Sequence, residues 1–244
     1  MKKFEFYNPT RIIFGEGTIA RLRDQIPQDA KVLLCYGGGS IKHNGVYDQV
    51  KTALGSWAMI EFGGIEANPD YDTLIKAILL GREKGVDFIL AVGGGSVIDG
   101  AKLVAAGIPY TAGEVWDIIT QDVKVKLGEA LPLGTVLTLP ATGTEMNGNS
   151  VISRRATEEK LAWVSEAAFP VFSILDPTTT YTLPAKQVGN GIVDAYVHVM
   201  EQYATYPVDA KIQDRQAEGI LLTLQEIGEK ALETPPDYET RANF

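Results

Sequence analysis

The sequence has 244 residues, of which 45% are hydrophobic and 22% charged, and its formal net charge is −9. This composition is that of a folded globular protein and excludes a disordered chain. The negative charge repels phosphate backbones and anionic lipid surfaces, so we expect neither nucleic acid nor a membrane as a partner. The single cysteine, Cys35, lies in an apolar run, which predicts a core residue in a protein of a reducing compartment.

The sequence offers no targeting or spanning segment. The first residues, MKKFEFYNPTRIIFGEG, contain two lysines but no apolar run long enough for a signal peptide. No stretch approaches the roughly 18 uninterrupted apolar residues that a membrane span needs. We therefore expect a cytoplasmic protein.

Short apolar, β-branched runs alternate with helical patterns over the first three quarters of the chain. They predict strands at 11–15, 31–36, 57–62, 87–92, 134–140 and 172–176. Apolar residues at helical spacing occur in 18–26 and 71–85, and the turn Asn68-Pro69-Asp70 signals the start of the second helix. The alternation predicts an α/β fold with a mostly parallel sheet that is covered on both faces.

The pattern changes after residue 176. The segment DPTTTYTLPAK, residues 176–186, has no periodic apolar signal and is typical of a connector. Beyond it only helices are expected, at about 185–205 and, after Pro207, at 209–232. Two helices are too few to close a second core, so we expect a truncated chain or one half of a split protein. The domains are expected at 1–180 and 181–244.

Two glycine-rich turns follow predicted strands, Gly37–Ser40 (GGGS) and Gly93–Ser96 (GGGS). A helix that starts after such a turn presents free backbone N–H groups and the positive end of its dipole, and glycine lets a phosphate come close. The alternative is a tight turn that only needs a positive φ. Neither turn has the G-x-G-x-x-G pattern of the Rossmann fingerprint. Two such turns suit a dinucleotide, which presents its pyrophosphate and, in NADP, also a 2′-phosphate.

The first of these turns bears on the choice of coenzyme. An acidic residue at this place would bind the ribose 2′-hydroxyl of NAD and repel NADP. The turn contains no Asp or Glu and is followed by Lys42, which favours NADP. The alternative is that Lys42 is a solvated surface charge.

A polar segment follows the fifth predicted strand. Residues 137–154, LTLPATGTEMNGNSVISR, concentrate hydroxyl and amide side chains at Thr138, Thr142, Thr144, Asn147 and Asn149. Such a cluster either lines a polar ligand site or is an ordinary polar loop.

The predicted helix at 189–203 carries an acid and a histidine. Asp194 and His198 are four residues apart and share one helix face, and Glu201 continues the stripe. Apolar residues surround them on nearly all sides, which predicts burial. The pair is either an Asp–His hydrogen bond in a core or half of a site for Zn²⁺ or Fe²⁺. The other histidine, His43, follows the first glycine turn and is not expected to be a third ligand.

Several motifs together resemble those of one family. They are NPTRIIFGEG, YGGGSIK, GGIEANPDY, AVGGGSVIDGAK, LPATGTEMN, LDPTTTYTLPAKQ, GNGIVDAYVHVMEQY and DAKIQDRQAEGILL. The chain resembles the iron-containing alcohol dehydrogenase family, and within it the branch of NADPH-dependent aldehyde reductases and butanol dehydrogenases, essentially from end to end. The resemblance implies a Rossmann-like α/β domain that binds a dinucleotide (1–180). The beginning of an α-helical metal-binding domain of the dehydroquinate synthase-like architecture would follow (181–244).

The resemblance also implies roles for particular residues. The pyrophosphate would be held by Gly94, Gly95 and Ser96, with Asp99 nearby. The adenosine 2′-phosphate would meet Gly37, Gly38 and Ser40. The nicotinamide half would lie along Thr138, Thr142 and Asn147, with Lys160 approaching from the next element. Asp194 and His198 match the first two metal ligands, and the sequence ends before the two histidines that complete the family's set.

The implied activity is reversible hydride transfer between NADP(H) and a short-chain alcohol or aldehyde, with Fe²⁺ or Zn²⁺ as a Lewis acid, in a homodimer. We expect the 244-residue chain alone to bind NADP(H) weakly, hold metal poorly and turn over little or nothing. Two alternatives stay open: a nucleotide-binding module without chemistry of its own, and a lyase or synthase of the dehydroquinate-synthase type. Gly189, where relatives carry alanine, should weaken its helix slightly.

Overall fold

The computed structural model describes residues 3–205 and 208–244, and the chain forms two compact units. The sheet unit comprises Asn8–Thr138 and Gly143–Asp176. The helical unit comprises Met1–Tyr7, Leu139–Thr142 and Pro177–Phe244. This division falls at Asp176, whereas the assignment of functional domains at residue 180 stays a prediction.

The sheet unit is built on six strands in the order β1-β8-β5-β4-β2-β3. Parallel pairings join β1 to β8, β8 to β5, β4 to β2 and β2 to β3. The strands are β1 (Arg11–Phe14), β2 (Lys31–Tyr36), β3 (Ala58–Phe62), β4 (Phe88–Gly94), β5 (Leu133–Leu139) and β8 (Phe172–Leu175). Each lies where an apolar run predicts a strand, so the expected α/β fold with a parallel sheet is confirmed.

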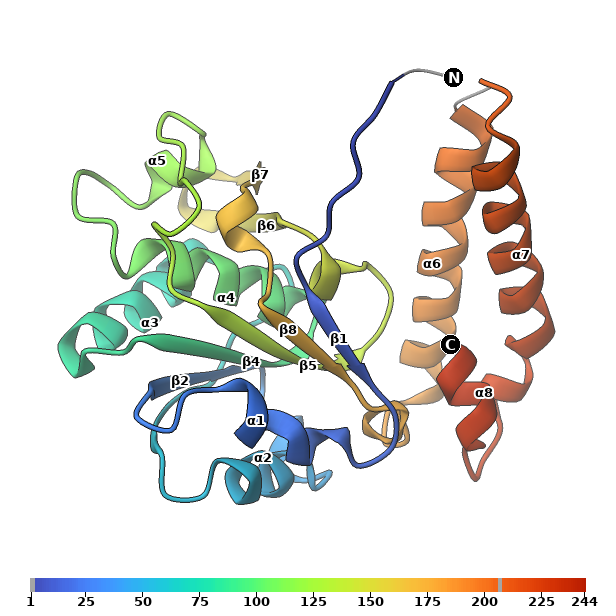
Figure 1. Ribbon diagram of the computed structural model, residues 1–244, viewed down its shortest axis with the longest axis horizontal. Helices are drawn as coiled ribbons and strands as arrows, with labels where there is room; N and C mark the ends of the chain where they lie inside the picture. The colour runs from blue at the N-terminus through green and yellow to red at the C-terminus, as the bar shows by residue number, and fades with distance from the viewer. Residues whose placement is uncertain (1–2, 206–207) are drawn as a thin grey trace. The chain divides into compact units, whose positions relative to one another are not determined.

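Helices cover both faces of this sheet (Figure 1). On β2, Val32 and Leu34 pack on the side of α1 (Leu22–Gln25) and α2 (Val46–Leu54). Leu33 and Cys35 alternate with them and pack on the side of α3 (Tyr71–Lys84) and α4 (Gly95–Gly107). All four side chains are fully buried. A strand that is buried on both faces must be apolar at every position, which is why these runs are so easily recognised.

Two local predictions are confirmed in the sheet unit. Asp70 caps α3, because its carboxylate accepts a hydrogen bond from the backbone N–H of Asp72 at 3.1 Å. Cys35 is a free thiol in the core, and burial raises its pKa to about 12. At neutral pH this thiol is therefore protonated and unreactive.

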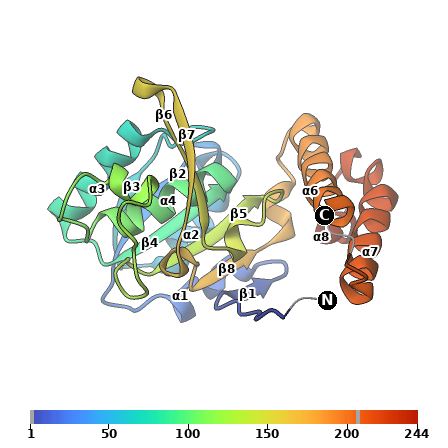
Figure 2. The same cartoon turned by 90° about the horizontal axis from the view of Figure 1, so that it is seen from above.

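An antiparallel hairpin in the sheet unit has no counterpart among the predicted elements. It consists of β6 (Asn149–Arg154) and β7 (Glu159–Val164), which pair with each other and form a separate two-stranded sheet. Figure 2 shows the hairpin apart from the main sheet, and β6 contacts α4. A short helix, α5 (Trp116–Ile119), contacts β7. The second half of the polar segment is therefore a strand fixed on α4.

After the 3₁₀ turn η6 (Pro177–Thr180), the regular elements among the described residues of the helical unit are all helices, as expected. They are α6 (Ala185–Thr205), α7 (Lys211–Ile227), η7 (Lys230–Leu232) and α8 (Tyr238–Asn243). The helix α6 packs against α7 and η7 (Figure 1). Among the described residues no helix is both long enough and apolar enough to cross a bilayer.

The expected burial of α6 is wrong for the described chain. Among the described residues of this helix, only Val188 and Gly191 are buried. Val193 and Val197 are 62% and 55% exposed. A helix that is apolar on nearly all sides needs neighbours on all sides, and here α7 and η7 cover only part of it.

Two glycines of α6 should respond oppositely to alanine. A Cβ on Gly189 would lie 3.8 Å from Leu232 Cδ2, an ordinary contact, so Gly189→Ala should stabilise the chain by about 0.5–1 kcal/mol through helix propensity. A Cβ on Gly191 would lie 2.7 Å from Phe244 Cζ and 2.9 Å from the Pro140 carbonyl, so Gly191→Ala should destabilise it by about 1–3 kcal/mol. Urea unfolding measures both, and equal effects of the two substitutions would contradict this packing.

Candidate functional site

The two glycine turns lie at one edge of the parallel sheet. Strands β2 and β4 are neighbours, and parallel strands place their carboxyl ends at the same edge. From β2 the chain continues to β3 on one side, whereas from β4 it continues to β5 on the other. This reversal is a topological switch point, the place where open α/β sheets bind their ligands.

The turn after β4 leads straight into α4. Gly94 is the N-cap residue and has an extended backbone, with φ −86 and ψ −170. Having no side chain, it offers no acceptor to the N–H groups of the first turn. A Cβ on Gly93 would lie 2.7 Å from Val97 Cγ2, so a side chain there would collide with α4. At Gly93 and Gly94 the glycines thus provide space and open N–H groups, which is the arrangement that accepts an anion.

Two of the predicted coenzyme residues meet at this turn through Asn68. The Asn68 backbone N–H donates to Ser96 Oγ at 3.3 Å. Lys160 Nζ, on β7, donates to Asn68 Oδ1 at 2.8 Å. The hairpin therefore brings the exposed Lys160 ammonium to the same edge as the first turn of α4, although the two residues are far apart in the sequence.

The turn after β2 has a different geometry. Gly39 has φ +96, a left-handed conformation that favours glycine, so the structural explanation for a glycine holds at this position. A Cβ on Gly37 would lie 3.2 Å from the Ile65 carbonyl oxygen, a tight contact that a larger residue could make only if the backbone at Ile65 shifted. Gly38 and Ser40 are exposed and within reach of a ligand.

A carboxylate from a neighbouring strand lies beside this turn. Glu61, on β3, is 2.8 Å from Lys42 Nζ and accepts hydrogen bonds from the hydroxyls of Tyr36 and Tyr47. Hydrogen bonds from Lys42 and Tyr47 lower the pKa of Glu61, and Glu61 in turn raises the pKa of Lys42. Lys42 also lies over both tyrosine rings, 5.0 and 4.9 Å from their centroids. The ammonium is thus held in place and neutralised.

Glu61 is a residue that sequence reasoning missed. The turn itself lacks Asp and Glu, but the carboxylate comes from the next strand of the sheet. The available signal was its place near the end of a predicted strand, WAMIEF, next to the strand that leads into the turn. A search limited to the turn cannot find it.

The residues predicted for the nicotinamide half are placed differently from one another. Thr138, near the end of β5, is half-buried, whereas Thr142 is exposed and belongs to the helical unit. Asn147 is half-buried, and its amide is tied into the chain. Its Oδ1 accepts from the Asn149 N–H at 2.9 Å, and its Nδ2 donates to the Gly143 carbonyl at 3.0 Å.

Asp99 faces the hairpin. Its carboxylate accepts hydrogen bonds from Thr144 Oγ1 at 2.5 Å and from the Val151 N–H at 3.0 Å. Burial raises the pKa of Asp99, while these two hydrogen bonds and Lys102 oppose the increase. Lys102 was also missed by sequence reasoning: it is fully buried on α4 and donates to Asn147 Oδ1 at 3.0 Å.

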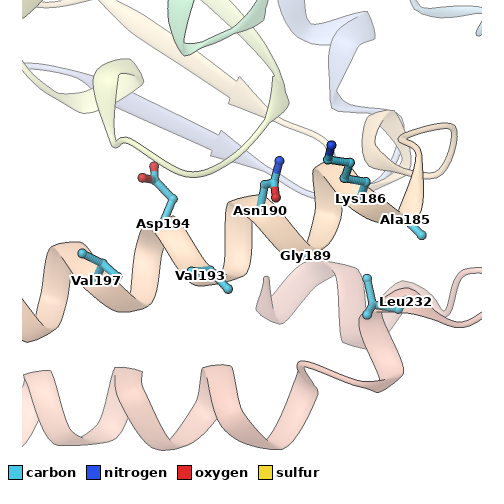
Figure 3. A pocket seen from close by; sticks show the side chains of 8 residues that line it. All are labelled: Ala185, Lys186, Gly189, Asn190, Val193, Asp194, Val197 and Leu232. Carbon is cyan, nitrogen blue, oxygen red and sulfur yellow. The ribbon is translucent and has the colours of Figure 1, made fainter.

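The two predicted metal ligands lie on α6 and face one another. His198 Nε2 is 3.6 Å from Asp194 Oδ2, and their side chains are 52% and 47% exposed. Figure 3 shows Asp194, Asn190 and Lys186 on one side of the helix, with Val193 on the opposite side. Among the described residues, no third His, Cys, Asp or Glu completes a group that could hold a metal ion. The two donor types suit Zn²⁺ or Fe²⁺, but two ligands alone do not make a catalytic site.

Comparison with known proteins agrees with the resemblance of the motifs. The family model described as "Iron-containing alcohol dehydrogenase" matches residues 9–177. Over the whole chain, the sequence is 57% identical to the NADPH-dependent aldehyde reductase YqhD of Escherichia coli, covering 63% of that protein. It is 48% identical, over 99% of the chain, to the probable NADH-dependent butanol dehydrogenase 2 of Bacillus subtilis, covering 62% of it.

Solved structures agree as well. A crystal structure of E. coli YqhD matches 99% of the chain with a TM-score of 0.94 at 56% identity, and the chain covers 62% of it. The NADH-dependent butanol dehydrogenase A of Thermotoga maritima matches the full chain with a TM-score of 0.94 at 43% identity, with 61% of that structure covered. The chain thus spans a little over three fifths of the length of these relatives. On the family match and these identities, the chain belongs to the iron-containing alcohol dehydrogenase family.

Proposed function

We propose that this chain is the coenzyme-binding part, with half of the metal site, of an NADP-linked oxidoreductase that interconverts short-chain alcohols and aldehydes. The observation that carries the proposal is the pair of glycine turns at the switch point of the sheet. One of these turns leads directly into the N-terminus of α4. Family membership supports it, and the E. coli relative carries the name of an NADPH-dependent aldehyde reductase.

The coenzyme would lie along the carboxyl edge of the sheet unit. Its pyrophosphate would bind the first turn of α4 at Gly94, Gly95 and Ser96, where N–H groups and the helix dipole favour negative charge. The 2′-phosphate would reach the exposed turn Gly37–Ser40, beside Lys42. The nicotinamide half would continue toward Thr138, Asn147 and Lys160, and Thr142 is a further member of this proposed set.

The metal, when bound, would polarise the oxygen of the aldehyde or alcohol, and either Fe²⁺ or Zn²⁺ fits the donors present. Asp194 and His198 would supply one carboxylate oxygen and one imidazole nitrogen from adjacent turns of α6. Their mutual distance of 3.6 Å and their exposure leave both donor atoms accessible to an ion. The remaining ligands would come from outside the described residues.

The second reading, a nucleotide-binding module without chemistry of its own, is not favoured by the family match or by the relatives. The third reading, a lyase or synthase of the dehydroquinate-synthase type, is not favoured by the relatives. Our proposal also includes a homodimer in the cytoplasm; the edge position of β1 supports strand pairing with a second chain.

A charge placed at the first turn of α4 tests coenzyme binding. We expect NADPH to bind the 244-residue chain weakly but saturably, measured by coenzyme fluorescence. Ser96→Asp should weaken binding of NADPH and NADH alike by at least about tenfold, because its carboxylate repels the pyrophosphate. A negative charge in this turn is favourable to the helix, so stability should not fall. Ser96→Ala is the matched control, and unchanged binding by Ser96→Asp would contradict the pyrophosphate site.

Coenzyme selectivity should depend on Lys42. Lys42→Ala should weaken NADPH binding by about tenfold, the effect of one lost charge-assisted contact, and leave NADH binding unchanged. Glu61→Gln should act in the opposite direction, because it frees the Lys42 ammonium that Glu61 neutralises. The measurement is the ratio of the two dissociation constants in each variant. A ratio that neither substitution alters would place the 2′-phosphate elsewhere.

Turnover should require more than this chain. Alone, the 244-residue chain should oxidise no NADPH with short aldehydes, even with added Fe²⁺ or Zn²⁺. Activity should appear when the chain is co-expressed with the C-terminal portion of the E. coli relative. In that complemented protein, Asp194→Asn and His198→Asn should abolish turnover and keep NADPH binding. A normal rate from the chain alone, with its length confirmed by mass spectrometry, would refute this expectation.

A further inference from the structure

A fully buried lysine lies between the two parts of the proposed coenzyme site. Lys102 is on α4, two turns beyond the glycine turn, and its side chain is 0% exposed. Lysine is almost never buried completely unless its charge is compensated, because removing an ammonium group from water is very costly. Its protein partners must therefore replace water at every N–H.

All the acceptors of Lys102 lie on one short segment, residues 144–149. Its Nζ donates to the Thr144 carbonyl at 2.8 Å, Thr144 Oγ1 at 2.8 Å, Asn147 Oδ1 at 3.0 Å and the Asn149 carbonyl at 2.7 Å. An ammonium has three hydrogens, so four acceptors satisfy it fully. The segment that the ammonium holds includes Asn147, one of the residues proposed for the nicotinamide half.

Asp99 strengthens the same connection from one turn earlier on α4. Thr144 Oγ1 accepts from Lys102 and donates to Asp99 Oδ1, so the hydroxyl links the two charges. The Val151 N–H donates to the Asp99 carboxylate, and Ser150 Oγ donates to its backbone carbonyl at 2.8 Å. The helix that starts at the pyrophosphate turn is thereby fixed to the segment 144–151.

The contacts determine how the Asn147 amide is turned. Lys102 and the Asn149 N–H both donate to Oδ1, so the oxygen must point toward α4. Nδ2 carries two hydrogens, and one of them is donated to the Gly143 carbonyl. Among the contacts of the described residues, this leaves the second hydrogen for a ligand. Without Lys102, the amide would keep only the Asn149 N–H on Oδ1 and the Gly143 carbonyl on Nδ2, so it and the segment around it would be held less firmly against α4.

We propose that Lys102 is a positioning residue for the coenzyme: it fixes Asn147 and the segment 144–149 relative to the first turn of α4, so that the nicotinamide half is held while the pyrophosphate is bound. This proposal rests on the proposed function. It does not make Lys102 a catalytic residue, since Lys102 reaches a ligand only through Asn147.

A purely structural cation that binds the other end of α4 provides the comparison. Arg82, on α3, donates to the carbonyls of Gly107, Ile108 and Tyr110 at the other end of α4. Like Lys102, it joins α4 to its surroundings through carbonyl oxygens. Its acceptors, however, lie far along the helix from the glycine turn. Loss of Arg82 should therefore cost stability without changing the geometry of the coenzyme site.

Protonation provides an independent readout. Burial lowers the pKa of Lys102 to about 8, against the opposing effect of the carboxylates of Asp99 on α4 and Glu145 on the 3₁₀ turn η3 (Thr144–Met146). Below pH 8 the ammonium donates three hydrogen bonds, and above it the neutral amine donates two. Coenzyme affinity should thus fall as the pH rises through about 8. In Lys102→Arg, whose side chain keeps its charge, the affinity should stay level.

The experiment compares two ligands on the 244-residue chain by calorimetry. One is NADPH, and the other is 2′-phosphoadenosine 5′-diphosphoribose, which lacks only the nicotinamide. Lys102→Met should weaken the binding of NADPH by about tenfold and the binding of the second ligand by less than about twofold. Lys102→Arg should restore most of the loss. Arg82→Gln should lower the melting temperature and leave both affinities unchanged.

Thr144→Val is the second variant, should Lys102→Met fail to fold. It keeps the shape of the side chain and removes only the hydroxyl between Lys102 and Asp99. It should weaken the binding of NADPH more than the binding of the ligand that lacks nicotinamide. Equal weakening of both ligands, or none, in the folded variants would overturn the positioning role while leaving the proposed function intact. If the unaltered chain binds neither ligand, the proposed function itself fails, and the positioning role fails with it.

Discussion

A parallel sheet that is covered on both faces leaves only the ends of its strands for binding, and this constraint governs the whole sheet unit. The side chains of β2 and β4 are buried on both faces, so neither face can accept a ligand. The polar features lie at the carboxyl edge instead. They are two glycine turns, the uncapped start of α4, and the charged groups of Lys42, Glu61 and Lys160. Binding is confined to the place where backbone N–H groups and charges gather.

Lys42 and Lys102 show how burial changes the role of the same side chain. The ion pair of Lys42 with Glu61 is partly solvated, with side chains 40% and 32% exposed, and pairs of this kind contribute little to stability. Such a pair can exchange its carboxylate for a phosphate at small cost. Lys102 is sealed and bonded to four oxygens, so it cannot exchange partners without leaving them unsatisfied. The contacts of Lys42 beside the turn Gly37–Ser40 can therefore change when a ligand binds, whereas the segment 144–149 is fixed.

The sequence predicted the sheet well because doubly buried strands must be continuously apolar. It did not predict the hairpin β6–β7, whose strands mix buried and exposed positions and begin within a polar segment. Nor could it place Lys102, because its acceptors lie 42 to 47 residues further along the chain and come together only in the folded state. Glu61 was missed for the same reason, because it reaches Lys42 only when β3 pairs with β2. The burial expected for α6 was wrong because an apolar pattern shows which residues a helix can bury, and not which neighbours cover them.

The buried thiol of Cys35 can report local opening of the sheet unit through its reactivity. This side chain lies in β2, which pairs with β3 and β4, is 0% exposed, and has a pKa that burial raises to about 12. A maleimide or an oxidant can reach it only when the strand separates from its neighbours, because the thiolate does not form in the closed core. The rate at which this single cysteine is alkylated therefore measures how often β2 separates from β3 or β4, without any engineered label.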